Sequence, residues 1–150
     1  MLPNFQYGYR KQHNTSQAIL DLTSFISQQC TKQEITIAVF MDLSKAFDTV
    51  DASILKQKLS ELGIFDMSAA LINNYVCSRQ FLMNEDDHEK LYSLTYGVPQ
   101  GSILGPLLFT MYTYDLTNIT STNKVIVYAD DTTVLVSGKN LTQAKQHCNA

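Results

Sequence analysis

Two adjacent aspartates, Asp130 and Asp131, lie between two short apolar runs near the end of the sequence. The runs, residues 125–127 and 134–136, are β-branched and apolar, which is typical of buried strands. Aspartate is uncommon inside strands but tolerates tight turns, so the pair predicts the tip of a β-hairpin. Like charges this close are costly without a cation between them, and carboxylates suit Mg²⁺ or Mn²⁺. For the dipeptide alone, a solvated Asp-Asp turn is the simpler explanation.

Another apolar, β-branched run occupies residues 35–42 and ends on Asp42. A charged residue that closes such a strand is expensive to bury without a partner. We therefore expect Asp42 at the carboxyl end of the strand, facing a cleft. Five residues further on, Phe47 is large and needs a packing surface or a ligand.

A glycine- and proline-rich stretch, residues 97–102, predicts a shaped turn. We expect Ser102 to cap the apolar helix that follows, because Pro106 is tolerable only in a first helical turn. Gln100 would then project just before the helix, and the glycines would let the backbone approach a ligand closely. A plain connection between a strand and a helix explains this stretch equally well.

The remaining elements are predicted from apolar periodicity and turn signals. They are helices over about residues 16–30, 52–62, 68–78 and 141–150, and a hairpin over residues 79–96, with ends uncertain by ~2–4 residues. Thr15 and Ser16 are expected to cap the first helix, with Ile19 facing inward, and Leu71 is expected to face inward from the third. Asp51 is expected to cap the second helix and Gly63 to end it.

Two further segments allow more than one interpretation. Residues 85–89 could be a metal cluster, but we interpret them as a solvated loop because no apolar framework holds their side chains. Residues 1–14 could be an extended aromatic segment with a basic tip, or an edge strand with a solvated end. Both interpretations of residues 1–14 stay open.

Composition predicts a globular chain of one ordinary domain, since 45% of its 150 residues are hydrophobic and 17% are charged. The net charge of −3 counts against a nucleic-acid binder acting in isolation, so any positive surface must be local or lie outside these residues. Cys30, Cys77 and Cys148 are widely spaced, form no metal-ligand pattern and suggest a reduced, intracellular chain. No signal peptide or run of membrane-spanning length is visible, so neither secretion nor membrane insertion is expected.

Three features then converge on one kind of site. Asp42 ends one strand, Asp130 and Asp131 form a hairpin tip, and Gln100 precedes a helix. Three carboxylates at adjacent strand ends can hold two divalent ions about 3.5–4 Å apart, which activate an attacking oxygen and stabilise a leaving one. We therefore predict a site for phosphoryl or nucleotidyl transfer.

These stretches resemble the palm region of reverse transcriptases, most of all those of non-LTR retrotransposons. Three motifs match: residues 39–48, residues 97–102 together with 104–109, and residues 128–131. Residues 7–10 with Thr15 and Ser16 resemble the family's preceding finger motif. The resemblance covers essentially the whole chain, and three long motifs in the right order are far more specific than one short motif. The resemblance implies an α+β fold: a polymerase right-hand palm, in which helices cover a small antiparallel sheet, with part of the fingers and no thumb. Residues 1–150 would then be a partial reverse transcriptase domain.

The resemblance also implies an RNA-directed DNA polymerase. Asp42, Asp130 and Asp131 would be the catalytic, metal-binding carboxylates for two Mg²⁺ ions, with Mn²⁺ as an alternative. The 3′-hydroxyl of a DNA primer would attack the α-phosphorus of a deoxynucleoside triphosphate (dNTP) on an RNA template, and pyrophosphate would leave.

The same resemblance assigns four substrate contacts. Phe47 resembles the bulky residue beneath the incoming sugar, whose ring would clash with a 2′-hydroxyl. Gln100 resembles the residue that contacts the incoming nucleotide, Arg10 would touch the nucleotide or template, and Tyr128 would pack beneath the primer end.

The chain departs from the family in several places. Tyr114 stands where the family usually has asparagine. The family's first finger motif, further palm strands, primer-gripping hairpin and thumb have no counterpart, so these residues alone are not expected to extend a primer processively. Two alternatives remain: an inactive remnant of a retrotransposon reading frame, or another two-metal phosphoryl-transfer enzyme. Phe47 and residues 98–101 count against the second, since hydrolysis needs no selection at the sugar.

Overall fold

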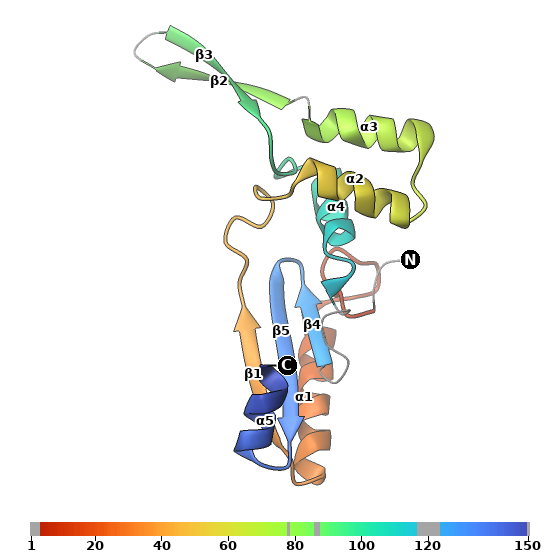
Figure 1. The fold of residues 1–150 in the computed structure, drawn as a ribbon, viewed down its shortest axis with the longest axis vertical. Helices are drawn as coiled ribbons and strands as arrows, with labels where there is room; N and C mark the ends of the chain where they lie inside the picture. The colour runs from red at the N-terminus through yellow and green to blue at the C-terminus, as the bar shows by residue number, and fades with distance from the viewer. Residues whose placement is uncertain (1–3, 78, 86–87, 117–123, 150) are drawn as a thin grey trace. The chain divides into compact units, whose positions relative to one another are not determined.

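The computed structural model describes residues 4–77, 79–85, 88–116 and 124–149 (Figure 1). They divide into two compact units. Lys45–Thr113 forms one, which we call the helical unit, and the described segments up to Ser44 and from Tyr114 onward form the other, the sheet unit. Helices and antiparallel strands occur in both, so the α+β class predicted from the sequence is confirmed.

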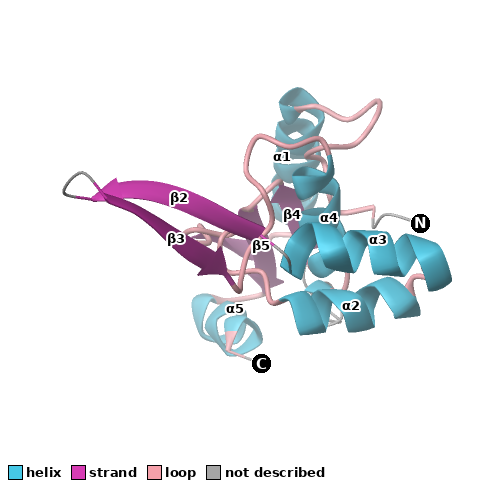
Figure 2. Cartoon of the chain, turned by 90° about the horizontal axis from the view of Figure 1, so that it is seen from above, coloured by secondary structure: helices cyan, strands magenta, loops and turns pink. Residues whose placement is uncertain are grey.

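The sheet unit contains one three-stranded antiparallel sheet and two helices. Its elements are α1 (Thr15–Thr31), β1 (Ile35–Met41), β4 (Lys124–Tyr128), β5 (Asp131–Gly138) and α5 (Leu141–Cys148). The strand order is β1-β5-β4, so β5 lies in the centre (Figure 1). Helices α1 and α5 lie on opposite sides of the strands (Figure 2). Ala18 of α1 packs on Ile126 and Leu135, which gives the sheet its buried centre.

The segment before α1 runs along the outer edge of β4. Gln6 forms a parallel bridge with Val127, whose N–H donates to the Phe5 carbonyl and whose carbonyl accepts from the Tyr7 N–H, both at 2.8 Å. This bridge is isolated, and the described residues around it form turns and irregular backbone rather than a regular edge strand or a continuous extended segment.

Helix α1 departs from two predictions. Its N-cap is Asn14, whose backbone is extended. The Asn14 side chain accepts a hydrogen bond from the Gln17 N–H (2.9 Å), and the Gln17 side chain accepts one from the Asn14 N–H. Thr15 and Ser16 are therefore not the cap. Ile19 is 62% exposed, not inward. Ala18 sits one residue earlier, about 100° away around the helix, and takes the buried position instead.

The described residues of the helical unit form three helices and a hairpin. Its elements are α2 (Ala52–Glu61), α3 (Asp66–Cys77), β2 (Arg79–Glu85), β3 (His88–Leu94) and α4 (Leu104–Tyr112). The predicted hairpin is confirmed, with Arg79 paired to Leu94. The cap is also confirmed, since Asp51 accepts from the Ser53 N–H (2.7 Å) and the Ile54 N–H (3.3 Å).

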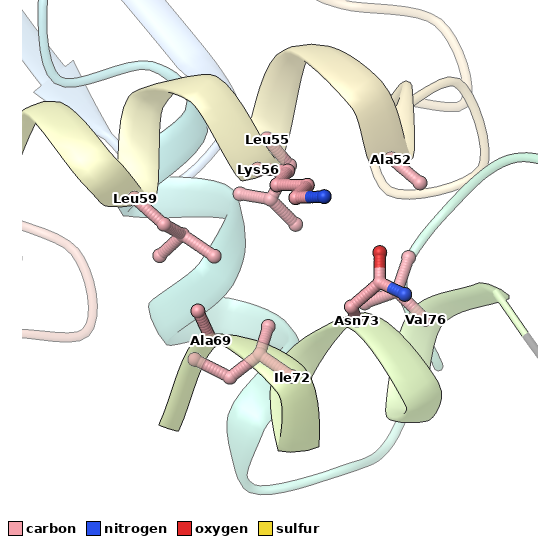
Figure 3. Close-up of a pocket in the computed structure, with 8 residues that line it drawn as sticks. All are labelled: Ala52, Leu55, Lys56, Leu59, Ala69, Ile72, Asn73 and Val76. Atoms are coloured by element: carbon pink, nitrogen blue, oxygen red, sulfur yellow. The ribbon is translucent and has the colours of Figure 1, made fainter. Parts of the chain in front are cut away.

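Helices α2 and α3 pack face to face, as Figure 3 shows. Leu55 and Leu59 of α2 and Ile72 and Val76 of α3 line a small pocket between the two helices. Leu71, expected to face inward, is 70% exposed, because its neighbour Ile72 takes the position toward α2.

Helix α4 begins two residues later than Ser102. Ser102 is not its N-cap: Ile103 holds that position with helical dihedral angles and no side-chain cap. The Ser102 hydroxyl instead joins the preceding turn to the helix, donating to the Pro99 carbonyl (2.7 Å) and accepting from the Gly105 N–H (2.9 Å). Pro106 falls in the first turn, as predicted.

Some expectations fall on residues outside the described ranges. These include residues 86–87 of the acidic loop and the predicted helix ends at residues 78 and 150. Cys30, Cys77 and Cys148 are free and exposed. Within the described ranges, no helix is both long and apolar enough to span a membrane.

The turn before Gln100 depends on Gly97. Its φ of +87° is in the left-handed region, and its N–H donates to the Val50 carbonyl at 2.7 Å. A Cβ at this position would lie 2.9 Å from both the Phe47 carbonyl oxygen and the Asp48 Cα. Both the backbone conformation and the close approach therefore require glycine.

We expect Gly97→Ala to lower the free energy of unfolding by about 2–5 kcal/mol, of which about 1–2 kcal/mol comes from the left-handed backbone and the rest from overpacking. Gly101→Ala is the matched control, because Gly101 has a φ of +75° but open space around it. It should show only the backbone cost. Urea unfolding measures both variants, and equal losses would contradict the contact argument.

A charged network ties the N-terminal segment to α1 and β4. The Tyr7 hydroxyl donates to Asp21 (2.7 Å), and the Lys124 ammonium pairs with the same carboxylate oxygen (2.7 Å). Burial and the Asp21 carboxylate raise the pKa of Tyr7 to about 12. Burial alone would raise the pKa of Asp21, but hydrogen bonds from Lys124 and Tyr7 outweigh it and lower that pKa.

The stabilisation from Asp21 is thus present above the ordinary pKa of an aspartate and is lost as pH falls through its lowered pKa. We expect Asp21→Asn to reduce the Tm at neutral pH and to have little effect in strong acid, as measured by circular dichroism. The contribution of Tyr7 should disappear only as pH rises toward 12. A pH-independent effect of Asp21→Asn would contradict the ionic network.

Candidate active site

Strand register places the three predicted aspartates at one end of the β1-β5-β4 sheet. The last pair between β1 and β5 joins Met41 to Thr132, so Asp42 follows directly beside the start of β5, where Asp131 lies. Between β4 and β5, Tyr128 pairs with Asp131, which leaves Ala129 and Asp130 as a two-residue hairpin tip. The hairpin predicted from the apolar runs is therefore present.

The three carboxylates share this end without forming a closed cage. Asp42 and Asp131 are exposed, and Asp130 is half-buried. Among the described residues, no three acidic, histidine or cysteine side chains gather closely enough to hold a metal ion. The arrangement is an open acidic sheet end, whose oxygen donors are the type that hard divalent cations prefer.

Two further predicted residues belong to the same unit. Tyr128 is the last residue of β4, partly exposed, and its side chain shares a sheet face with that of its partner Asp131. Arg10 is half-buried in the loop before α1, where its guanidinium donates to the Asn4 side chain (3.4 Å).

Phe47 and Gln100 belong to the helical unit, where they are close neighbours. The Phe47 carbonyl accepts from the Val98 N–H (2.7 Å), and the Gln100 amide donates to the Asp48 carboxylate (2.9 Å). The half-buried Phe47 ring packs on Phe109, with ring centroids 4.8 Å apart. The unit thus holds both predicted residues through contacts between residues 47–48 and the turn before α4.

Two residues that form hydrogen bonds at the candidate site, Asp48 and Gln6, were not among the predicted site residues. Asp48 orients Gln100, and its place within the stretch that resembles the palm motif was an available signal. Gln6 is buried against the hairpin tip through hydrogen bonds to Ala129. No local signal indicates Gln6, because its partner lies 123 residues away in the sequence.

Comparisons with known proteins identify the family of the chain. The sequence model of the family "Reverse transcriptase (RNA-dependent DNA polymerase)" matches residues 1–150. The chain is 30% identical over 152 residues to the RNA-directed DNA polymerase from mobile element jockey of Drosophila melanogaster, covering 95% of this chain and 16% of that protein. It is 32% identical over 152 residues to the probable RNA-directed DNA polymerase from transposon BS of the same organism, covering 96% of this chain and 17% of that protein.

Solved structures show the same fold at low sequence identity. Apo telomerase from Candida tropicalis, truncated from its C-terminal domain, aligns with 97% of this chain and 32% of its own, at 13% identity and a TM-score of 0.65. Telomerase from Candida albicans in complex with a fragment of telomeric RNA aligns with 97% of this chain and 28% of its own, at 12% identity and a TM-score of 0.68. Reverse transcriptases generally use divalent metal ions, which suits an acidic sheet end. The chain belongs to the reverse transcriptase family.

Proposed function

We propose that this chain is the fingers and palm part of an RNA-directed DNA polymerase of the non-LTR retrotransposon type. The observation that carries the proposal is the register that brings Asp42, Asp130 and Asp131 to one end of the sheet. The relatives from mobile elements support the type of polymerase. The reaction is primer extension from a dNTP on an RNA template.

In this proposal, Asp42, Asp130 and Asp131 hold two Mg²⁺ ions, with Mn²⁺ as an alternative. Carboxylate oxygens at an open strand end suit these hard cations, and neutralising three neighbouring negative charges favours their binding. When bound, the ions supply activation of the attacking oxygen and stabilisation of the leaving one. The protein's own contribution is to fix where the carboxylates stand, through the pairing of β1, β5 and β4.

Phe47 and Gln100 select the nucleotide in this proposal. The packing of Phe47 on Phe109 leaves its ring little freedom to move aside, so it can exclude a 2′-hydroxyl by steric conflict. Asp48 accepts from the Gln100 amide and orients it toward one geometry before a nucleotide binds. Arg10 contacts the template or the nucleotide, and Tyr128 contacts the primer end.

Further segments are needed to hold the nucleic acid. The net charge of −3 gives little general attraction for phosphates, whose neutralisation dominates nucleic-acid affinity. The chain spans only 16–17% of the first two curated relatives. We therefore propose that it acts within a longer polymerase whose other segments bind the RNA template and DNA primer.

We expect Asp130→Asn, in the full-length polymerase, to lower primer extension by about a thousandfold or more, because charge stabilisation worth several kcal/mol is lost. The fold should stay intact, since asparagine also tolerates the turn. Asp66→Asn is the matched control, as Asp66 is an exposed aspartate of the helical unit. Single-turnover extension on an RNA template measures both, and full activity of Asp130→Asn would refute the proposed function.

We expect Phe47→Val to raise ribonucleotide incorporation relative to deoxynucleotide incorporation by about tenfold to a hundredfold, the usual range for steric discrimination by a few methylene-sized groups. The measurement is the ratio of kcat/KM values for the two nucleotides. Phe65→Val, a change at an exposed phenylalanine of the same unit, should leave the ratio unchanged. If Phe47→Val also leaves it unchanged, Phe47 does not select the sugar.

A further inference from the structure

Gln6 is one of the most deeply buried side chains in the described part of the protein. It is 1% exposed, although it lies in the segment along the outer edge of β4 rather than in a regular strand or helix. A buried amide costs free energy unless its donor and acceptor are both satisfied. The partners of Gln6 therefore determine where this segment and the hairpin tip can lie.

Those partners are concentrated on a single residue of the hairpin tip. The Gln6 Oε1 accepts from the Ala129 N–H (3.1 Å), and the Gln6 Nε2 donates to the Ala129 carbonyl (3.3 Å). The same Oε1 also accepts from the Gly8 N–H (2.8 Å). One side-chain amide thus binds both backbone groups of the residue that precedes Asp130.

Ala129 needs such support because its backbone is strained. Its φ is +61°, in the left-handed region, which is unfavourable for a residue with a Cβ. Strained residues persist only where their surroundings hold them in place. The next residue is Asp130, so the peptide that Gln6 binds also sets the direction in which the Asp130 side chain leaves the tip.

Gly8 makes the approach between the segment and the tip close enough for these hydrogen bonds. A Cβ on Gly8 would lie 2.3 Å from the Ala129 nitrogen and 2.9 Å from its Cα, which no real contact tolerates. Any larger residue would push the segment and the tip apart. Gly8 and Gln6 therefore act on the same backbone atoms from one side of the tip.

We propose that Gln6 is a positioning residue for the polymerase site, which fixes Ala129 in its left-handed conformation and so orients the Asp130 and Asp131 carboxylates. The inference rests on the proposed function, because it concerns the same carboxylates. Gln6 does not reach the substrate; it acts through the backbone of Ala129. Gly8 supports this role by permitting the close approach.

The test replaces Gln6 by methionine in the full-length polymerase, which keeps the length of the side chain and removes its hydrogen bonds. Gln29→Met is the matched control: Gln29 is also a buried glutamine, 5% exposed, but lies near the end of α1. Both variants lose a buried amide. Only Gln6→Met should lower kcat, by about tenfold to a hundredfold, with the KM for dNTP little changed, because a misplaced catalytic group costs about this much.

Two measurements besides activity separate positioning from general stability. Hydrogen exchange at the Ala129 amide should accelerate in Gln6→Met and stay slow in Gln29→Met. Binding of Mn²⁺, followed by electron paramagnetic resonance, should weaken by about tenfold in Gln6→Met alone. If exchange at Ala129 accelerates while kcat and Mn²⁺ affinity stay at wild-type values, Gln6 is only structural and the inference is wrong.

A second variant keeps the test decisive if Gln6→Met does not fold. Gly8→Ala retains the Gln6 amide but separates the segment from the tip, so it should show the same loss of kcat and Mn²⁺ affinity. Wild-type kcat in Gly8→Ala would overturn the inference. Failure of the proposed function is recognised separately: Asp130→Asn would then retain primer extension, whatever the Gln6 and Gly8 variants do.

Discussion

The pairing of β1 with β5 is the constraint on which the candidate site depends. In antiparallel strands a slip of one residue transfers every side chain to the other face of the sheet. The register that joins Val39 to Val134 and Met41 to Thr132 therefore decides that Asp42 arrives beside the hairpin tip. The register is fixed away from the site, where Leu135 packs beneath α1. An apolar core thus determines the positions of groups that are themselves exposed and charged.

Two unfavourable contributions to the free energy of the sheet unit act at the hairpin tip. It combines neighbouring negative charges on Asp130 and Asp131 with a left-handed residue at Ala129. Charge repulsion and backbone strain at one point are tolerated only where other interactions hold the turn. The buried strand residues on both sides and the Gln6 hydrogen bonds supply that support. This pattern is expected of a functional site, at which local stability is exchanged for a fixed geometry.

The sequence predicts the candidate site residues better than it predicts the residues that hold them in place. Asp42 and Asp130 could be found because each closes or follows a short β-branched run, which is local information. The N-cap of α1 could not be decided, because Asn14, Thr15 and Ser16 all cap helices well and only the backbone at Asn14 turned out extended. The inward orientation predicted for Leu71 and Ile19 was wrong for a related reason. Periodicity predicts only an apolar stripe on a helix, and the packing of the neighbouring element decides which residues of that stripe are buried. Local sequence patterns could not predict the role of Gln6, because that role depends on hydrogen bonds to Ala129, which is distant in the sequence.

Both units fix a candidate site residue in the same way. In each, a glycine allows one backbone to approach another more closely than any Cβ would permit: Gly8 against Ala129, and Gly97 against residues 47–48. In each, a glutamine side chain then adds directional hydrogen bonds, Gln6 to the backbone of Ala129 and Gln100 to the Asp48 carboxylate. Backbone-to-backbone packing resists displacement because neither side can change rotamer to escape, whereas a side-chain contact can relax. The two glycines therefore help to fix the geometry of the candidate site, although they carry no side-chain functional group. Substitutions there should change the positions of the site residues without changing the charge of the site.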